Sequence, residues 1–155
     1  MPQSSCLKVT FLFVSIIFPF CFAKVFEPCE LAKAMIENYR FQKADIADWI
    51  CLIRWESHYN TSAVGMLNAD GSTDHGLFQI SGKYWCADGD IGGACGLDCK
   101  SLQDDDIADD SVCARRIFRV TKHKTGNGFS AWAAWTQRCQ NQEYKQSFIK
   151  DCNLE

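Results

Sequence analysis

The chain lacks the excess of positive charge that sequence-independent nucleic-acid binding requires. Its 155 residues carry 16 lysines and arginines against 19 aspartates and glutamates, a formal net charge of −3 at pH 7. Binding of that kind depends on neutralising phosphates with basic side chains. We therefore expect no nucleic-acid partner. The short basic runs Arg115–Arg116 and Lys122–Lys124 are expected on solvated surface.

The chain also lacks an apolar run long enough to cross a membrane. The longest, Val9–Phe22, is shorter than the roughly 20 apolar residues that span a bilayer. Lys8 precedes this run, and the small residue Ala23 and then Lys24 follow it, which is typical of a secretory signal cleaved after Ala23. The sequence therefore predicts a signal peptide over residues 1–23 and a secreted, extracellular chain over residues 24–155, with no membrane span.

Pairs of cysteines in the Cys-x-x-Cys spacing are absent, which argues against a structural zinc site. Of the ten cysteines, two lie in the predicted signal. An even set of eight in a secreted chain indicates four disulfides, although eight cysteines allow 105 pairings. Internal repeats and linker-like tracts are absent too, so we expect one domain and a monomer. The eight are Cys29, Cys51, Cys86, Cys95, Cys99, Cys113, Cys139 and Cys152.

Helical patterns stand at both ends of the mature chain, with turn and strand signals between them. Pro28 suits a helix start, and Asp45 is the expected N-cap of an almost wholly apolar central helix that includes Trp49 in the core. The dipeptide Asp70–Gly71 predicts a hairpin turn. This order predicts an α+β domain. The expected elements are helices over 28–40, 46–57, 110–120, 129–139 and 143–149, a strand over 77–80, and a disulfide-held loop over 82–99.

Two acids stand out, although neither is decisive alone. Glu56 ends the apolar central helix, where burial would raise the pKa of its carboxyl group; its structural alternative is a simple pair with an arginine. Asp74 lies near a turn, where an aspartate often only satisfies backbone donors.

Several motifs in order carry more information than either acid. The segments KVFEPCELAKAM, WESHYNT, NADGSTDHGLFQIS, YWC and GNGFSAWAAW follow one another along the mature chain. With the order of the eight cysteines, they resemble the C-type lysozyme and α-lactalbumin superfamily over essentially all of residues 24–155. The resemblance implies a lysozyme-like fold: a helical subdomain and a small β-hairpin subdomain with the active-site cleft between them. It also implies the disulfide pairs Cys29–Cys152, Cys51–Cys139, Cys86–Cys99 and Cys95–Cys113.

The same resemblance implies a retaining glycoside hydrolase that cleaves β-1,4 bonds between N-acetylmuramic acid and N-acetylglucosamine in bacterial peptidoglycan, with chitin oligomers as secondary substrates. Glu56 would be the general acid, and Asp74 the ionised nucleophile or stabiliser. Tyr84 and Ser81 replace residues common in the family, tryptophan and asparagine respectively. No cofactor is expected for catalysis. The residues expected to bind substrate are Asn68, Gln79, Ser81, Tyr84, Trp85, Ala131 and Trp132.

The stretch LQDDDIADDSVC, residues 102–113, crowds five aspartates together. Counted back from Cys113, the side chains of Asp104, Asp109 and Asp110 stand where calcium-binding members of the superfamily have ligands. The backbone carbonyls of Ser101 and Asp106 would complete a structural Ca²⁺ site. The spacing is not that of an EF-hand, and the alternative is a solvated acidic helix start.

Calcium loops are typical of the α-lactalbumin branch, whose members lack glycosidase activity. A non-catalytic, calcium-binding regulatory protein is therefore the second hypothesis for this chain. That branch does not keep the acid pair whole. Because Glu56 and Asp74 are both present, the sequence favours the enzyme.

Overall fold

The computed structural model describes residues 23–154, so the predicted signal segment lies, apart from Ala23, outside the described residues. Along this part of the chain, two α-helices come first, two short strands follow, and three α-helices come last. The α-helices are α1 (Pro28–Glu37), α2 (Ile46–Glu56), α3 (Ala108–Thr125), α4 (Ala133–Arg138) and α5 (Gln142–Ser147); the strands are β1 (Asp74–His75) and β2 (Ile80–Ser81); the 3-10 turns are η1 (Lys43–Asp45), η2 (Cys99–Gln103) and η3 (Gly128–Ala131).

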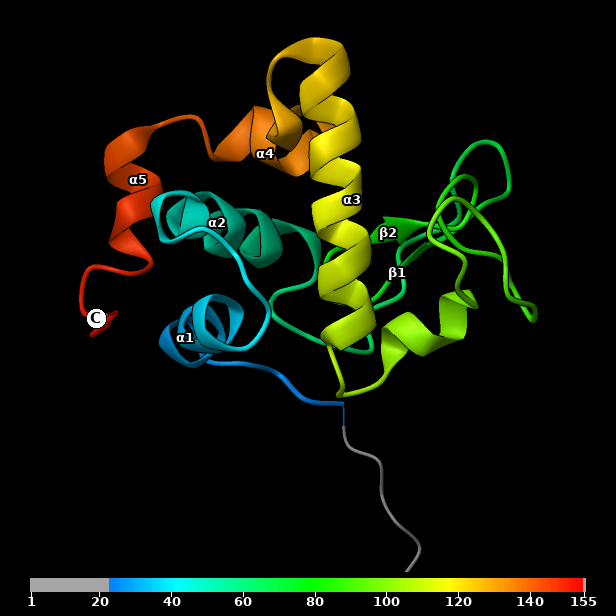
Figure 1. Cartoon of the computed structure of the whole chain (residues 1–155), viewed down its shortest axis with the longest axis horizontal. Helices are drawn as coiled ribbons and strands as arrows, with labels where there is room; N and C mark the ends of the chain where they lie inside the picture. The colour runs from blue at the N-terminus through cyan, green and yellow to red at the C-terminus, as the bar shows by residue number, and fades with distance from the viewer. Residues whose placement is uncertain (1–22, 155) are drawn as a thin grey trace, which may run out of the picture.

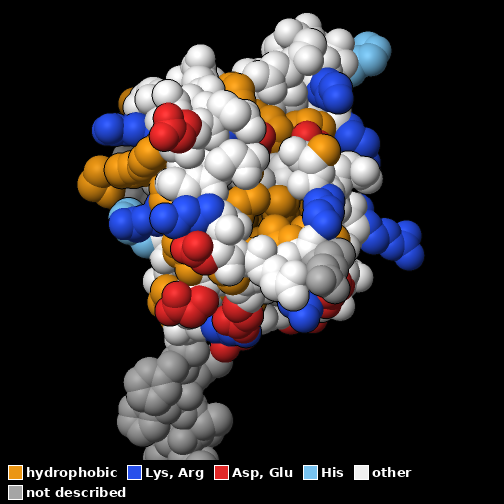
Figure 2. Space-filling model, turned by 90° about the vertical axis from the view of Figure 1, so that its left-hand side faces the viewer, with side chains coloured by type: hydrophobic (Ala, Val, Ile, Leu, Met, Phe, Trp, Pro, Cys, Tyr) orange, Lys and Arg blue, Asp and Glu red, His pale blue; other side chains and the backbone are white. Residues whose placement is uncertain are grey.

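The molecule has a helical part and a hairpin part. Figure 1 shows α1, α2, α4 and α5 on one side, the strands and their long loops on the other, and α3 running between the two. This is the α+β, lysozyme-like architecture predicted from the sequence. In Figure 2, basic side chains are scattered among acidic and uncharged ones on the face shown. No helix among residues 23–154 is long and apolar enough to cross a membrane.

The central helix α2 is buried as its composition predicts. Every residue from Ile46 to Ile53 is buried, and Trp49 is only 2% exposed. The centroid of its ring lies 5.0 to 5.8 Å from the ring centroids of Phe41, Phe78, Phe118, Phe129 and Trp132. Asp45 occupies the N-cap position, but its side chain makes no capping hydrogen bond, because the 3-10 turn η1 leads directly into the helix.

The hairpin region contains two reversals of the chain, of which the sequence predicted one. At Asp70–Gly71 the chain turns back as predicted: the Gly71 N–H donates to the carbonyl of Asn68 at 2.9 Å, and Val64 forms an antiparallel bridge with His75. β1 then pairs with β2 in the register Asp74 to Ser81, with a second reversal at Gly76–Gln79 that the sequence did not predict. The predicted strand over 77–80 is wrong except for Ile80. Leu77 and Phe78 are consecutive and both wholly buried, whereas neighbouring strand residues would point to opposite faces. Positive φ angles at Gly76 (73°) and Gln79 (48°) accommodate the turn.

The helices after the hairpin also have bounds that differ from the predicted ones. α3 is longer than the predicted 110–120, and the predicted helix over 129–139 is divided into η3 and α4. Trp132 between them has extended backbone angles, φ −109° and ψ 120°, and its indole Nε1–H donates to the carbonyl of Phe78 at 2.9 Å. That hydrogen bond ties the α3–α4 connection to the hairpin turn.

All four implied disulfide pairings are present; two join distant segments of the chain and two hold the loop after β2. Cys29–Cys152 connects the two ends of the described chain and Cys51–Cys139 joins α2 to the end of α4. Cys86–Cys99 closes the loop after β2, and Cys95–Cys113 attaches that loop to α3. The loop therefore keeps its shape with little regular secondary structure.

Candidate active site

A cleft of about 490 Å³ opens between the hairpin and the helices. The C-terminal end of α2, the strands, one face of α3 and the start of α4 form its walls. Both predicted acids, Glu56 and Asp74, line it. So do all seven residues expected to bind substrate: Asn68, Gln79, Ser81, Tyr84, Trp85, Ala131 and Trp132.

Glu56 is the last residue of α2, so it leaves the apolar helix at the edge of the cleft. Burial raises the pKa of its carboxyl group from 4.5 to about 7. This value includes two smaller effects: a hydrogen bond from the backbone N–H of Ala134 lowers the pKa, and the negative charge of Asp74 raises it. The structural alternative, a pair with an arginine, is absent in residues 23–154, since no ion pair there includes Glu56. Glu56 can therefore hold a proton near neutral pH.

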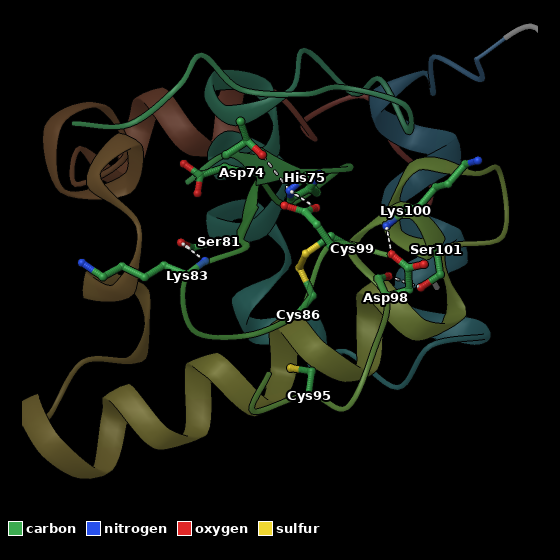
Figure 3. The surroundings of a disulfide bond; sticks show 12 residues. Asp74, His75, Ser81, Lys83, Cys86, Cys95, Asp98, Cys99, Lys100 and Ser101 are labelled. Atoms are coloured by element: carbon green, nitrogen blue, oxygen red, sulfur yellow. Dashed lines mark hydrogen bonds and ion pairs between the residues drawn. A yellow bond between two sulfur atoms is a disulfide. The ribbon is translucent and has the colours of Figure 1, made fainter. Parts of the chain in front are cut away.

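Asp74 lies in a more polar setting on β1. Asn68 Nδ2 donates to its Oδ1 at 3.4 Å, and the N–H of Gly65 donates to its backbone carbonyl at 2.8 Å. Figure 3 shows the carboxylate of Asp74 on the side of Ser81. The next residue, His75, points instead toward the Cys86–Cys99 disulfide. The strand thus presents one side chain to the cleft and the next to the interior.

The imidazole of His75 connects β1 to η2. It is 4% exposed, and its Nε2 and Nδ1 lie 2.9 Å from Thr73 Oγ1 and Gln103 Nε2 respectively. Gln103 ends η2. His75 therefore holds the strand that carries Asp74 against the segment that precedes the aspartate cluster. The sequence contained no signal for this role.

The three aromatic residues of the cleft are exposed to different degrees. Tyr84 is 59% exposed and Trp132 only 5%; Trp85 is half-buried. Trp132 belongs to the hydrophobic core, and its N–H is already used. It can form an apolar wall, but it offers a sugar little surface. Tyr84 and Trp85 are the better platforms for sugar rings.

The amide of Gln79 is largely committed to the fold. Its Nε2 donates to the carbonyls of Gly76 at 2.9 Å and Ala63 at 3.2 Å. Only its carbonyl oxygen is left for a ligand, so Gln79 can contribute to substrate binding as a hydrogen-bond acceptor. Ser81 and Ala131, from opposite walls, complete the predicted set.

One pair of cleft residues escaped the sequence analysis. Lys83 Nζ lies 2.6 Å from Asp70 Oδ2, and both residues line the cleft. The bond and the charge of Lys83 lower the pKa of Asp70, and Asp70 raises that of Lys83. The two residues are 13 positions apart in the sequence. No local pattern predicts their pairing, which depends on the fold.

The aspartate cluster leads into α3. Asp104 and Asp106 are exposed, and Asp105 accepts hydrogen bonds from the backbone N–H of Lys24 at 2.9 Å and from Thr61 Oγ1 at 2.8 Å. Asp110 differs, because it is 1% exposed and no donor reaches either of its carboxylate oxygens. Burial, followed by the charge of Asp109, raises the pKa of Asp110 to about 9.

The cluster does not gather its carboxylates around one point. In the part of the chain that the structure describes, the only three potential ligand side chains within 4.8 Å of one another are His75, Cys86 and Cys99. Those two cysteines form a disulfide with each other, so they cannot act as thiolate ligands.

Comparison with known proteins agrees with this architecture. Residues 24–152 match the model of the C-type lysozyme/alpha-lactalbumin family. A protein named Lysozyme C from Scophthalmus maximus is 40% identical over 136 residues, which cover 85% of this chain and 90% of that protein. Lysozyme C-1 of Mus musculus is 42% identical over 139 residues, 85% of this chain and 88% of the relative. The crystal structure of a lysozyme from Litopenaeus vannamei superposes with a TM-score of 0.76 at 36% identity, covering 86% of this chain and 100% of the other.

Proposed function

Because the chain belongs to the C-type lysozyme/alpha-lactalbumin family, we propose that it is a secreted lysozyme that hydrolyses the β-1,4 bonds between N-acetylmuramic acid and N-acetylglucosamine in bacterial peptidoglycan. Secretion would remove residues 1–23 and leave a monomeric domain over residues 24–155. Chitin oligomers would be secondary substrates. The observation that carries the proposal is the pairing, in one cleft, of a buried acid with a raised pKa and a second, more polar acid.

The two acids would divide the chemistry between them. Glu56, protonated near neutral pH, would donate its proton to the glycosidic oxygen as the bond breaks. Asp74, supported by Asn68, would act as nucleophile or stabilise the oxocarbenium-like transition state on the other side of the bond. This division is the one described for lysozymes, where the two acids are about 5–5.5 Å apart; it is carried over to this chain through its family.

Sugar binding would use the surface around this pair. Tyr84 and Trp85 would stack on sugar rings, and the hydroxyl of Ser81 and the backbone of Ala131 would bind their polar groups. Trp132 would keep the surroundings of Glu56 dry, and so favour the protonated form of the acid.

We also propose a structural calcium ion at the aspartate cluster. The carboxylates of Asp104, Asp109 and Asp110 and the carbonyls of Ser101 and Asp106 supply the hard oxygen donors that Ca²⁺ prefers. The supporting observation is Asp110, a buried carboxyl group whose oxygens have no donor. Such a group is costly unless a cation or a hydrogen bond satisfies it. The ion would stabilise the start of α3 and take no part in catalysis.

The direct test of the proposed function is clearing of a bacterial cell-wall suspension. Wild type should clear it, whereas Glu56→Gln should be slower by at least about 100-fold, since a general acid contributes 10²–10⁴ to the rate. Glu143→Gln makes the same change at an exposed position outside the cleft and should clear it normally.

Two results would count against the proposal. Equal clearing by wild type and Glu56→Gln would remove Glu56 from the mechanism. No clearing by a well-folded wild type would favour the non-catalytic, calcium-binding alternative.

A further inference from the structure

A second hollow, of about 200 Å³, lies outside the cleft and is bordered by three arginines. Arg40 comes from the segment after α1, and Arg115 and Arg119 from α3. Aromatic side chains form its apolar part, namely Phe41, Trp49 and Phe118. The Cζ of Arg115 lies 5.8 Å from the centroid of the Phe41 ring, within the range of a cation–π contact. We refer to this hollow as the arginine pocket.

The positive charges of the arginine pocket are not neutralised by the protein. Among residues 23–154, no carboxylate forms an ion pair with any of its three arginines. Asp45 also borders the hollow, and is its one acid. Burial and then the charges of Arg119 and Arg40 lower the pKa of Arg115. Three positive charges therefore border one hollow that contains a single acid, in a protein whose overall charge is negative.

The backbone at Arg40 makes this arrangement costly. Its φ angle is 59°, in the left-handed region where a residue other than glycine is strained by roughly 1–2 kcal/mol. Glycine is the usual residue where a helix ends in this way, and Phe41 N–H closes the end of α1 by donating to the carbonyl of Met35 at 3.0 Å. A turn of this kind needs no arginine, so the side chain requires a separate explanation.

Helix geometry separates the arginine pocket from the cleft. Arg115 and Arg119 are four residues apart and share one face of α3. Ile117 and Thr121 line the cleft. Each lies two residues after one of these arginines, which rotates its side chain by about 200° around the helix axis. A ligand in the arginine pocket would therefore leave the two catalytic acids free.

We propose that the arginine pocket binds a phosphate ester. Guanidinium groups hold phosphate oxygens through paired, charge-assisted hydrogen bonds, and a phosphate monoester carries nearly two negative charges near pH 7. The small volume suits the phosphate and the few atoms next to it, which would rest on the aromatic side chains. The source of the phosphate can be a soluble ester or the headgroup of a phospholipid.

The test is calorimetric titration of glycerol 1-phosphate into the purified protein at constant ionic strength. Wild type should bind one equivalent. Arg119→Gln and Arg40→Gly should bind at least tenfold more weakly. Arg116→Gln makes the same charge change as Arg119→Gln on the same helix but outside the arginine pocket, and should bind within twofold of wild type. Because Arg40→Gly relieves backbone strain, its melting temperature should equal or exceed that of wild type, so lost binding would not reflect lost folding.

Vesicles identify the source of the phosphate. Selective sedimentation of wild type with phosphatidylglycerol vesicles over phosphatidylcholine vesicles, lost in Arg119→Gln, indicates a headgroup; binding of the soluble ester alone indicates a free phosphate. Absence of saturable binding to either, or equal weakening by Arg116→Gln and Arg119→Gln, would overturn the proposal. Cleavage of chitin oligomers should be unchanged in all three variants, so this result is independent of the proposed catalytic function.

Discussion

At the scale of single residues, the proposed chemistry depends on the proton of Glu56. Its position at the end of an apolar helix, on a cleft wall that also includes Trp132, leaves the side chain only partly exposed. The general acid must be protonated to act. Because burial raises the pKa of Glu56 to about 7, the carboxyl group stays largely protonated through the mildly acidic range, where an ordinary glutamate is already ionised.

This predicts the alkaline limit of activity. The kcat/KM for a soluble chitin oligomer should fall as pH rises through about 7, with the slope of a single proton. Measuring the initial rate from pH 5 to pH 9 checks this. An alkaline limit near 4.5, the ordinary value for a glutamate, would show that Glu56 is not the acid.

The same pKa shift predicts an effect on stability. The folded state holds the Glu56 proton up to pH of about 7, and the unfolded state only up to 4.5. Stability is therefore lost as pH rises between these values, by up to about 3 kcal/mol. Glu56→Gln avoids this loss. Urea unfolding should show little difference between the two proteins at pH 4 and a more stable variant at pH 8; a constant difference at both pH values would contradict the shift.

At the scale of elements, the β1–β2 turn is the part that positions β1, the strand that carries Asp74. Gly76 packs its backbone directly on η2 and α3. A Cβ atom there would lie 1.9 Å from the carbonyl oxygen of Leu102 and 2.8 Å from Asp110 Oδ1. A hydrogen bond between His75 and Gln103 also connects β1 to η2. The position of Asp74 therefore depends on how closely this turn approaches the segment before α3.

Replacing Gly76 tests this dependence. Gly76→Ala should destabilise the fold by more than about 4 kcal/mol, because backbone atoms cannot yield to the new methyl group. Gly71→Ala is the matched control, since Gly71 also has a positive φ of 83° but nothing lies within 4 Å of its Cβ position; it should cost only about 1 kcal/mol. Denaturant unfolding of both variants measures the difference, and similar losses would mean that packing at Gly76 is not the cause.

At the scale of the whole molecule, the aspartate cluster and the disulfides join the two parts of the fold. Cys95–Cys113 attaches the loop after β2 to α3, and Asp110, on the same helix, faces the hairpin turn at Gly76. A calcium ion at this place would stabilise the contact between the hairpin part and the helical part, since it neutralises a buried acid between them.

The calcium proposal predicts a melting temperature that depends on the ion. At a calcium concentration 100 times the Kd, the ion should add about 2.7 kcal/mol, or about 10 °C. EDTA should remove this gain and added calcium restore it. Asp110→Asn should abolish the response, whereas Asp105→Asn, which affects bonds to Lys24 and Thr61, should keep it. A melting temperature that changes neither with EDTA nor with added calcium would show that the site is not real.

The sequence by itself determined the class of fold and the buried central helix, and it selected Glu56 and Asp74 as the candidate acids. The apolar composition of α2 makes it a core helix. The family motifs place Glu56 at the end of this helix and Asp74 in the hairpin region. The disulfide pairing also came from the resemblance. Local turn chemistry was right at Asp70–Gly71, where the chain reverses and Val64 pairs with His75. It did not predict the reversal at Gly76–Gln79, because burying Leu77 and Phe78 together outweighs the strand preference of that segment.

Only the tertiary structure decided which distant groups meet. The raised pKa of Glu56 needs the walls of the cleft, the ion pair of Asp70 and Lys83 needs the turn before β1 to meet the segment after β2, and both amide hydrogens of Gln79 are donated to the carbonyls of Gly76 and Ala63. The arginine pocket joins the end of α1 to the middle of α3, more than 70 residues apart in the sequence. Charge, desolvation and hydrogen bonding act over a few ångströms, so their effects at these sites depend on which chain segments the fold brings into contact.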